Sequence, residues 1–526
     1  REARKEVEGV NHTTRLLIAE VVLLLLSLAV AAVASGAEPA KLEYAAGPHD
    51  WTGWALADLV TLPESERPFT RYIAIPHWGS DKWVAAINYG NNTAISHARV
   101  IQLGQPIANG WMVRVNLARL VPDRVRLAKT IATWDALAIR DPYLHIPEQN
   151  SGAKVAVLAP TIDPEQAKLL AGTTLSVGAV YRADWLLAQM LDTIDGRQYY
   201  EFRQVARKPE KGTALDNWLS ERGVFLSTTS KVGGERRFAM LTSEVAAYKP
   251  RRGDILPTLS GGICSITYDN FDADRDAKKH PIRNLLEFQH DGSEIISALP
   301  NGMLDYLLAD GQGGIVGEAP PNLVRDHTIP APHTARLRPA ISCISCHSLE
   351  GEDGWRRVRN DVLTAIGTGR LNVFADFADL GLSSEEVVDK LAGLYALDVE
   401  QADGILARAR RDHNNAVAQC SKGIPLDPDK SPVVQIGQLT TSIVHGYDYQ
   451  LVTPAIAARE LGYRVPDDYE GNPLDSVLGP IGEADETREA DPIIGFLRIG
   501  VPVNRVDFEG VYQDILLMSE ARRRAK

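Results

Sequence analysis

The sequence predicts an α+β protein with a β-containing N-terminal region, a central segment of β-hairpins and a helical C-terminal part. Short runs rich in aromatic and β-branched residues, separated by glycine and asparagine, recur before residue 320. Segments with apolar residues at helical spacing become frequent after residue 380. The 526 residues exceed one ordinary domain, and a hydrophobic share of 44% is enough for a packed core.

The N-terminus carries the features of an export segment. Basic residues up to Arg15 precede an apolar run from Val21 to Ala34, and small residues suited to cleavage follow. We expect residues 1–37 to be a signal peptide, because this run is shorter than the ~20 residues that span a bilayer. The alternative is an uncleaved membrane anchor, since residues 16–18 lengthen the run. Both interpretations place the rest of the chain in the periplasm or another extracytoplasmic space, where thiols oxidise.

The overall charge narrows the range of partners. A net charge of −12 argues against nucleic acid and against anionic membrane surfaces. We expect contact with a membrane only if the N-terminal segment is retained.

Residues 38–250 are expected to form a mixed, β-rich N-terminal domain. Tryptophan recurs here, and core packing explains it better than a ligand groove does. The region shows no nucleophile–base pattern and no phosphate loop. Strands are expected over 71–75, 83–88 and 111–117, and helices over 163–171 and 182–191.

Residues 251–425 are expected to form a central domain that begins with hairpins. Residues 261–268 predict a strand, and residues 288–303 predict strand, turn and strand, closing at Pro300–Gly302. A second hairpin is expected over 307–316. The alternating acids Asp272, Asp274 and Asp276 resemble the start of a calcium loop, but Ala277 stands where such a loop needs glycine. We expect a solvated acidic turn instead.

The most specific pattern is Cys343-Ile-Ser-Cys346-His347, a C-x-x-C-H motif. Two thiols at this spacing can each add to one vinyl group of a porphyrin, and the following histidine can bind the iron, so the motif predicts covalent attachment of haem c. A redox dithiol is an alternative, but the thioredoxin kind has a strand before it and a helix opening at the first cysteine. A zinc site would need a second ligand pair, and a disulfide across so tight a loop would be strained.

The run from Phe288 to His347 resembles a family of exported bacterial monohaem cytochromes. The resemblance is clear over about 255–350 and weaker over about 70–200. This resemblance implies haem binding and electron transfer, and it does not indicate a substrate. The residues that carry it are His290, Asp291, Gly292, Glu294, Leu299 to Gly302, Tyr306, Leu308, Asp310, Gly314, Ala319, Pro320, Leu323, Val324, Asp326 and Ser342 to His347.

The sequence does not decide which residue is the second axial ligand of the expected iron. The only methionine after the motif is Met518, far along the chain. His290 is the tentative distal ligand, because it lies in the run that resembles the haem family; a simple backbone contact of this histidine is equally compatible. A five-coordinate iron is a further alternative. The other candidates are Met303, His327, His333, His413 and His445.

The remaining cysteines, Cys264 and Cys420, form a possible disulfide in an oxidising compartment. The bond requires Cα atoms within ~6 Å, which a sequence does not reveal. Two buried free thiols are the alternative.

The chain after the motif is expected to be helical, with residues 426–526 as a C-terminal region. Ser383 and Glu386 form a capping box. Residues 466–491 are acidic and rich in glycine and proline, so we expect irregular structure there. Further helices are expected from Asp398 to Ala409, from Leu451 to Leu461 and from Asn504 to Arg523.

These observations favour an electron carrier with one covalent haem c and a redox partner protein. A haem peroxidase or a gas or redox sensor with an open distal site is the enzyme-class alternative. A cell-envelope binding protein with structural haem is the third.

Overall fold

The computed structural model of the chain has an α+β fold, which confirms the predicted class. The predicted export segment at 1–37 and the predicted helix at 163–171 lie outside the described residues. Among the described residues, no helix is long and apolar enough to cross a membrane. The structure describes residues 41–95, 98–121, 123–144, 178–194, 197–208, 211–224, 236–243, 245–246, 250–272, 276–282, 284, 288–331, 333–349, 354–368, 381–395, 399–479 and 491–525.

A four-stranded sheet lies in the N-terminal region, in the order β3-β4-β2-β5. β4 runs antiparallel to both of its neighbours, and β5 runs parallel to β2. β2 (Thr70–Ala74) and β4 (Met112–Asn116) confirm the strands predicted at 71–75 and 111–117. The other two strands are β3 (Gly104–Ile107) and β5 (Val180–Arg182).

The second sheet is antiparallel throughout and has six strands in the order β11-β10-β9-β8-β7-β6. The strand predicted at 261–268 and the hairpin predicted over 307–316 are confirmed. The prediction of two strands within 288–303 is wrong, because this range holds one strand, β9, and the turn after it, and the partner strand β10 begins only at Leu304. β6 precedes residue 250, so this sheet starts before the expected boundary at 251. The strands are β6 (Arg236–Met240), β7 (Arg251–Pro257), β8 (Ile263–Asp269), β9 (Gly292–Ala298), β10 (Leu304–Asp310) and β11 (Ile315–Val316).

Among the described residues of 38–250, helices outweigh strands, so the expectation of a β-rich domain is not met there. The helix predicted over 182–191 is present as α8. The helices are α2 (Pro48–Thr61), α3 (Trp83–Ala94), α4 (Leu117–Leu120), α5 (Arg124–Arg140), α8 (Ala183–Leu191), α9 (Tyr199–Arg203) and α10 (Ala214–Glu221).

After residue 340 the described elements are helices, as predicted, apart from β12 (Tyr463–Arg464), which pairs with β1 (Glu43–Tyr44). The capping box of Ser383 and Glu386 is present, and α18 lies in the segment expected to be irregular. The helices are α11 (Ile341–His347), α12 (Asp361–Gly367), α14 (Ser384–Leu394), α15 (Val399–Cys420), α16 (Pro432–Tyr449), α17 (Pro454–Glu460), α18 (Pro473–Leu478), α20 (Pro492–Arg498) and α21 (Arg505–Ala525).

The prediction of a strand over 83–88 is wrong, because these residues belong to α3. Every residue from Ala85 to Ala94 is buried, since α3 packs against α8, α15 and α16. A helix buried on all sides has no single apolar stripe, so periodicity does not distinguish it from a buried strand.

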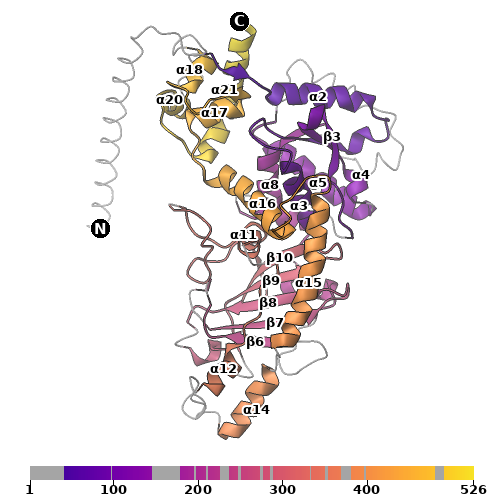
Figure 1. The fold of residues 1–526 in the computed structure, drawn as a ribbon, viewed down its shortest axis with the longest axis vertical. Coiled ribbons are helices and arrows are strands. Elements are labelled where there is room, and N and C mark those ends of the chain that lie inside the picture. The colour runs from indigo at the N-terminus through magenta and orange to yellow at the C-terminus, as the bar shows by residue number, and fades with distance from the viewer. Residues whose placement is uncertain are drawn as a thin grey trace, which may run out of the picture.

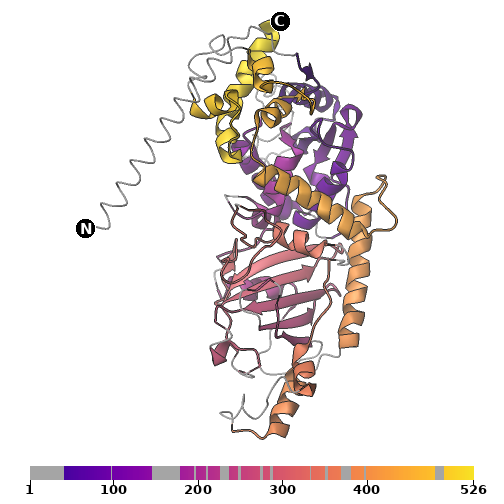
Figure 2. The same ribbon diagram turned by 60° about the vertical axis from the view of Figure 1, so that its left-hand side comes forward.

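The two faces of the six-stranded sheet have different neighbours. α15 runs alongside the sheet, and α11 lies between the sheet and α16 (Figures 1 and 2). On the opposite face, α9 docks through Arg203, whose Nη2 lies 2.7 Å from a carboxylate oxygen of Asp305 in β10. The residues after α10 dock on the same carboxylate through Arg222 at 2.5 Å.

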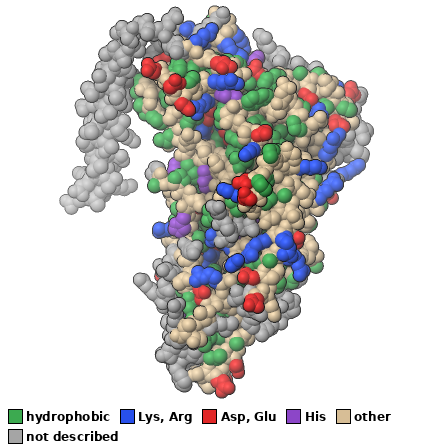
Figure 3. Space-filling view, viewed as in Figure 1, with side chains coloured by type: hydrophobic (Ala, Val, Ile, Leu, Met, Phe, Trp, Pro, Cys, Tyr) green, Lys and Arg blue, Asp and Glu red, His purple; other side chains and the backbone are tan. Residues whose placement is uncertain are grey.

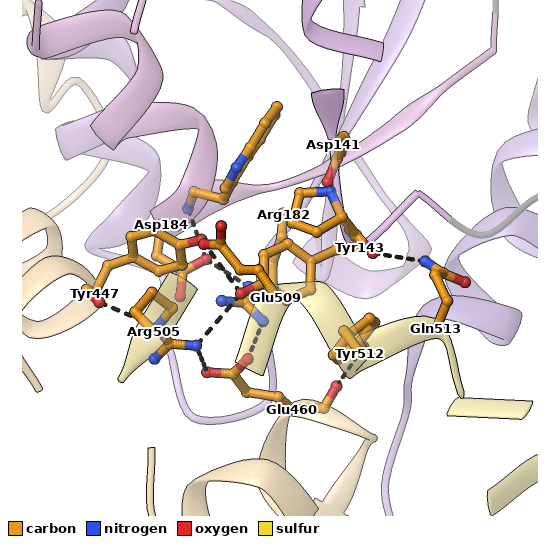
Figure 4. Close-up of polar contacts among 12 residues, drawn as sticks. Asp141, Tyr143, Arg182, Asp184, Tyr447, Glu460, Arg505, Glu509, Tyr512 and Gln513 are labelled. Atoms are coloured by element: carbon orange, nitrogen blue, oxygen red, sulfur yellow. Dashed lines mark hydrogen bonds and ion pairs between the residues drawn. The ribbon is translucent and has the colours of Figure 1, made fainter. Parts of the chain in front are cut away.

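A buried ionic network ties the C-terminal helices to the N-terminal region (Figure 4). Arg182, at the end of β5, lies 2.7 Å from Asp184 and 2.6 Å from Glu460. Arg505, the first residue of α21, reaches the second oxygen of Glu460 at 2.6 Å. The Arg182 guanidinium also lies 3.7 Å from the ring centroid of Tyr143. The regions predicted as 38–250 and 426–526 therefore pack together and share one hydrophobic core with the central sheet.

Candidate functional site

The short helix α11 carries the C-x-x-C-H motif and packs tightly under α16. Gly437 of α16 permits this approach, because a Cβ there would lie 2.4 Å from the Cβ of Ser348. The residue before the helix, Ala340, has a φ of 61°, a conformation that L-residues adopt only when their surroundings impose it.

Polar contacts on both sides hold α11 in place. The Arg338 backbone N–H donates to Ser342 Oγ at 3.0 Å, and the Ser345 hydroxyl donates to Thr328 Oγ1 at 2.9 Å. The Arg338 guanidinium forms a buried ion pair with Asp192. The motif thus stands on a rigid element, which a fixed cofactor geometry requires.

Cys343, Cys346 and His347 all line one cavity of about 560 Å³. This volume lies within the range of cofactor pockets. The floor is the sheet face that carries Arg251, Thr267 and Glu294. The other walls are α15 and the segments 238–245 and 355–359, through Phe238, Met240, Thr242, Ser243, Val245, Trp355, Arg356, Arg357, Val358, Arg359, Leu406 and Arg410.

The ring of His347 is oriented as a metal ligand. Its Nδ1 lies 2.5 Å from the carbonyl oxygen of Gly354. A carbonyl only accepts, so Nδ1 carries the proton and Nε2 keeps its lone pair, the arrangement usual for metal-bound histidine. Burial, with the nearby Arg356, lowers the pKa of His347 to about 4. The imidazole is therefore neutral at pH 7, as metal binding requires.

The two thiols of the motif are free and protonated. Burial raises the pKa of Cys346 to about 12 and that of Cys343 well above its ordinary value, and Glu294 and Asp326 raise both further. A redox dithiol needs the opposite, a thiolate stabilised by positive surroundings. The helix also opens at Ile341 rather than at Cys343. These features disfavour the dithiol alternative.

The cavity offers donors to an anionic group. Trp355 Nε1 and Arg410 Nη2 are buried at its wall and have no hydrogen-bond partner among the described residues. The Arg410 Nε–H donates to the backbone carbonyl of Trp355 at 2.6 Å, which ties the Arg410 side chain to the Trp355 backbone. Five arginines line the cavity against one acid, Glu294, and Lys and Arg side chains gather over the sheet and α15 in Figure 3. Arginine suits carboxylates, and a haem carries two propionates, so the donor set fits this group.

The acid in the cavity belongs to a buried cluster on the floor. Arg251 Nε lies 2.7 Å from Asp269, and Arg251 Nη2 donates to Glu294 and to Thr267 Oγ1, each at 2.9 Å. Burial raises the pKa of Asp269 to about 7, although Arg251 acts in the opposite direction.

His290, the tentative distal ligand, is not at the cavity. Its ring packs edge-on against Tyr268, with 4.8 Å between centroids, and lies parallel to Phe288. The Tyr268 hydroxyl donates a hydrogen bond to the Asp254 carboxylate. Both side chains lie on the face of the sheet opposite to Glu294. Because side chains alternate between faces along a strand, this neighbourhood is separated from the motif by the sheet itself. The prediction of His290 as a ligand is therefore not supported.

None of the other ligand candidates lines the cavity, although the His413 ring lies beside Gly354. These candidates are Met303, His327, His333, His413 and His445. Met240 does line the cavity, and sequence reasoning missed it. Met240 lies in an edge strand about a hundred residues before the motif, whereas all the candidates named from the sequence lie at residue 290 or later. Strand pairing between β6 and β7, which the sequence did not reveal, brings Met240 beside Arg251.

The possible disulfide between Cys264 and Cys420 is not formed, since both are buried free thiols. Cys264 lies in β8, on the sheet face away from the cavity. Cys420 ends α15 and contacts Asn92 of α3, whose Nδ2 lies 3.7 Å from the sulfur. Burial raises the pKa of each thiol to about 12.

Among the described residues, no group of three or more His, Cys, Asp and Glu side chains is placed to hold a metal ion. The zinc alternative thus gains no support from them. The acidic turn expected at Asp272–Asp276 lies partly outside the described residues. No protein-family model, no curated protein and no solved structure matches this chain.

Proposed function

We propose that this chain binds one haem c covalently and transfers single electrons outside the cytoplasm. The observation that carries the proposal is the His347 ring: neutral, with Nδ1–H bonded to Gly354, and next to two free thiols in one cavity. In this proposal Cys343 and Cys346 form the thioether bonds and His347 binds the iron.

The remaining cavity residues position the cofactor. Trp355 Nε1 and Arg410 Nη2 bind a propionate, which gives each of these buried donors an acceptor. The sheet floor excludes water from the porphyrin face, which tunes the reduction potential. A bound haem supplies one-electron chemistry, and a redox partner protein delivers and removes the electron.

The second axial position decides between two functions. Apart from α11, the lining side chains able to bind iron are the Met240 thioether and the Glu294 carboxylate, and Glu294 is engaged by Arg251. If Met240 held the iron together with His347, the site would suit electron transfer. Without it the position is open, which favours the peroxidase or sensor alternative.

The intact mass of the protein, produced in a host that matures c-type cytochromes, tests the proposal. We expect the mass of the polypeptide plus one haem, together with a Soret band. Cys343→Ala and Cys346→Ala should each remove one thioether bond and reduce the yield of coloured protein severely. Cys420→Ala removes a thiol outside the cavity and should leave the covalent haem in place. A colourless wild-type protein with the mass of the bare polypeptide contradicts the proposal.

A further inference from the structure

Two tryptophans of the N-terminal region line a second cavity, of about 550 Å³, which shares no residue with the cavity of the motif. Trp51, Trp134 and Trp185 are buried in the core. Trp54 and Trp111 are only half-buried, and both line this second cavity. Apolar walls with a few polar groups are typical of a small-molecule site, and an indole offers a large apolar surface to a ligand.

The second cavity lies beside α2 (Figure 1), where distant segments of the chain meet. α2 contributes Trp54, and the turn between β3 and β4 contributes Ile107 and Trp111. His77, which follows β2, and Arg464 of β12 form a polar end. Pairing of β12 with β1 brings Arg464 to the N-terminal region, so the cavity exists only in the folded chain.

The turn between β3 and β4 is held in a strained conformation. Ala108 and Asn109 follow one another in the left-handed region, with φ of 49° and 56°. Alanine adopts this region only when its surroundings impose it. Ala108 packs against the hydrophobic cluster that contains Trp51, and it also lines the cavity. Strained residues concentrate at binding sites, where a fixed shape is needed, and this turn fixes the wall that carries Trp111.

The polar end of the cavity favours an anionic group. Burial lowers the pKa of His77 to about 4, and the charges of Arg464 and Arg459 add to this effect. The imidazole is therefore neutral at pH 7 in positive surroundings, and its Nδ1 is buried with no hydrogen-bond partner among the described residues. Arg464 pairs with Glu43 at 3.5 Å, but both side chains are more than half exposed, so this ion pair is weak. The Arg464 guanidinium is thus available to an anion in the cavity.

The lining favours an aromatic ring over a sugar as the body of the ligand. The carboxylate of Asp58, the other charged lining group, already accepts the Tyr72 hydroxyl and Arg114 Nη1, each at 2.8 Å. A sugar would bring several hydroxyls against apolar walls, and a buried hydroxyl without a partner is costly. An aromatic ring needs no such partners.

We propose that this cavity binds a small aromatic carboxylate, whose ring lies against Trp54 and Trp111 and whose carboxylate pairs with Arg464. Nδ1 of His77 is a further donor to this carboxylate in the tautomer that carries its proton there. Binding is reversible and makes no covalent bond. The inference does not depend on the proposed haem, because Cys343, Cys346 and His347 line the other cavity.

Isothermal titration calorimetry of the full chain at pH 7 tests the proposal, with indole-3-acetate and benzoate as probes. We expect one molecule to bind with a Kd below ~1 mM, which is within reach of ligands of this size. Tryptophol keeps the indole ring and replaces the carboxylate with a hydroxyl. It should bind at least ~10-fold more weakly than indole-3-acetate, because it loses the charge-assisted hydrogen bonds to Arg464. Glucuronate keeps a carboxylate without an aromatic ring and should not saturate the site.

Two variants separate the two ends of the site. Arg464→Gln should weaken binding of indole-3-acetate at least ~10-fold and leave that of tryptophol unchanged. Trp111→Ala should weaken the binding of both compounds, with circular dichroism as the check that the variant folds. Arg336→Gln is the matched control, because it removes the same charge from an exposed ion pair with Glu318 and should leave both affinities unchanged.

Three outcomes overturn the proposal. The first is no saturable binding of either aromatic acid, the second is an affinity for indole-3-acetate that Arg464→Gln leaves unchanged, and the third is tighter binding of glucuronate than of indole-3-acetate. Each of these results is read without the haem. A colourless protein that binds indole-3-acetate therefore contradicts the proposed function and supports this inference.

Discussion

At the scale of single residues, the orientation of His347 depends on a glycine that no other residue could replace without strain. Gly354 has a φ of +80°, and a Cβ at this position would lie 2.5 Å from the His413 ring. Its carbonyl accepts the Nδ1–H of His347 and so directs Nε2 away from the backbone. The sequence reveals the histidine through its place after two cysteines, but the residue that selects its tautomer is visible only in the fold.

The role of Met240 is a prediction at this scale. Met240→Leu keeps the volume of the side chain and removes the sulfur. We expect the ferric holoprotein to lose the thioether-to-iron charge-transfer band in the red, and the ferrous form to bind carbon monoxide at least ~10-fold more tightly, because no iron–sulfur bond competes.

Met303→Leu is the control, since Met303 is buried outside the cavity. Its spectra should match those of the wild type. If the wild type already binds carbon monoxide as tightly as Met240→Leu does, the iron is five-coordinate and the sensor or peroxidase alternative is favoured.

At the scale of elements, caps mark helices that the sequence analysis did not predict. α5 begins after Asp123, whose side chain accepts the Arg126 N–H, and α16 begins after Ser431 with Pro432 in its first turn. Both are standard start signals that could have located these helices. The capping box at Ser383, by contrast, was predicted and is present. Local signals of this kind are encoded within a few residues, so a sequence is sufficient to find them.

A buried carboxylate at the end of α5 predicts that the stability of the protein depends on pH. Asp141 follows this helix, and one of its oxygens, Oδ2, is buried without a hydrogen-bond partner among the described residues. Burial raises its pKa to about 8, although the Tyr143 N–H lowers it. Between the unfolded value of ~3.9 and 8, the folded state binds more protons than the unfolded state. This contribution to stability is therefore complete below pH ~3.9 and is lost as the pH rises to 8.

Asp141→Asn should flatten the fall of the thermal unfolding midpoint between pH 5 and 8 and make the variant more stable than the wild type at pH 9, by an amount on the order of a few kcal/mol. Asp123→Asn is the control, because asparagine caps a helix as well as aspartate does and the site is exposed. Parallel pH profiles for wild type and Asp141→Asn would contradict the prediction.

At the scale of the whole molecule, the ionic network around Glu460 joins parts of the chain that are far apart in sequence. Arg182 comes from β5, Glu460 from α17 and Arg505 from α21 (Figure 4). All three side chains are buried. Removal of one partner from such a network leaves uncompensated charge, which costs about 3–5 kcal/mol.

Glu460→Ala should therefore lower the free energy of unfolding by about 3–5 kcal/mol, since it leaves both arginines short of an acceptor. Denaturant unfolding followed by circular dichroism measures the change. Glu43→Ala, which removes an exposed ion pair with Arg464 at 3.5 Å, is the control and should have little effect. Equal stability of the two variants would show that the network does not hold the C-terminal helices in place.

The sequence by itself determined the α+β class, the hairpin over 307–316, the helical character after residue 380 and the motif of Cys343, Cys346 and His347. These features depend on patterns of a few residues, such as alternation, turns, caps and the spacing of two thiols and an imidazole. Only the tertiary structure decided that His290 lies across the sheet from the motif, that Cys264 and Cys420 remain separate, and that Met240, Glu294 and Arg410 share the cavity with His347. The physical reason is that strand pairing and helix packing bring together residues from distant parts of the chain, and short-range patterns carry no record of those contacts.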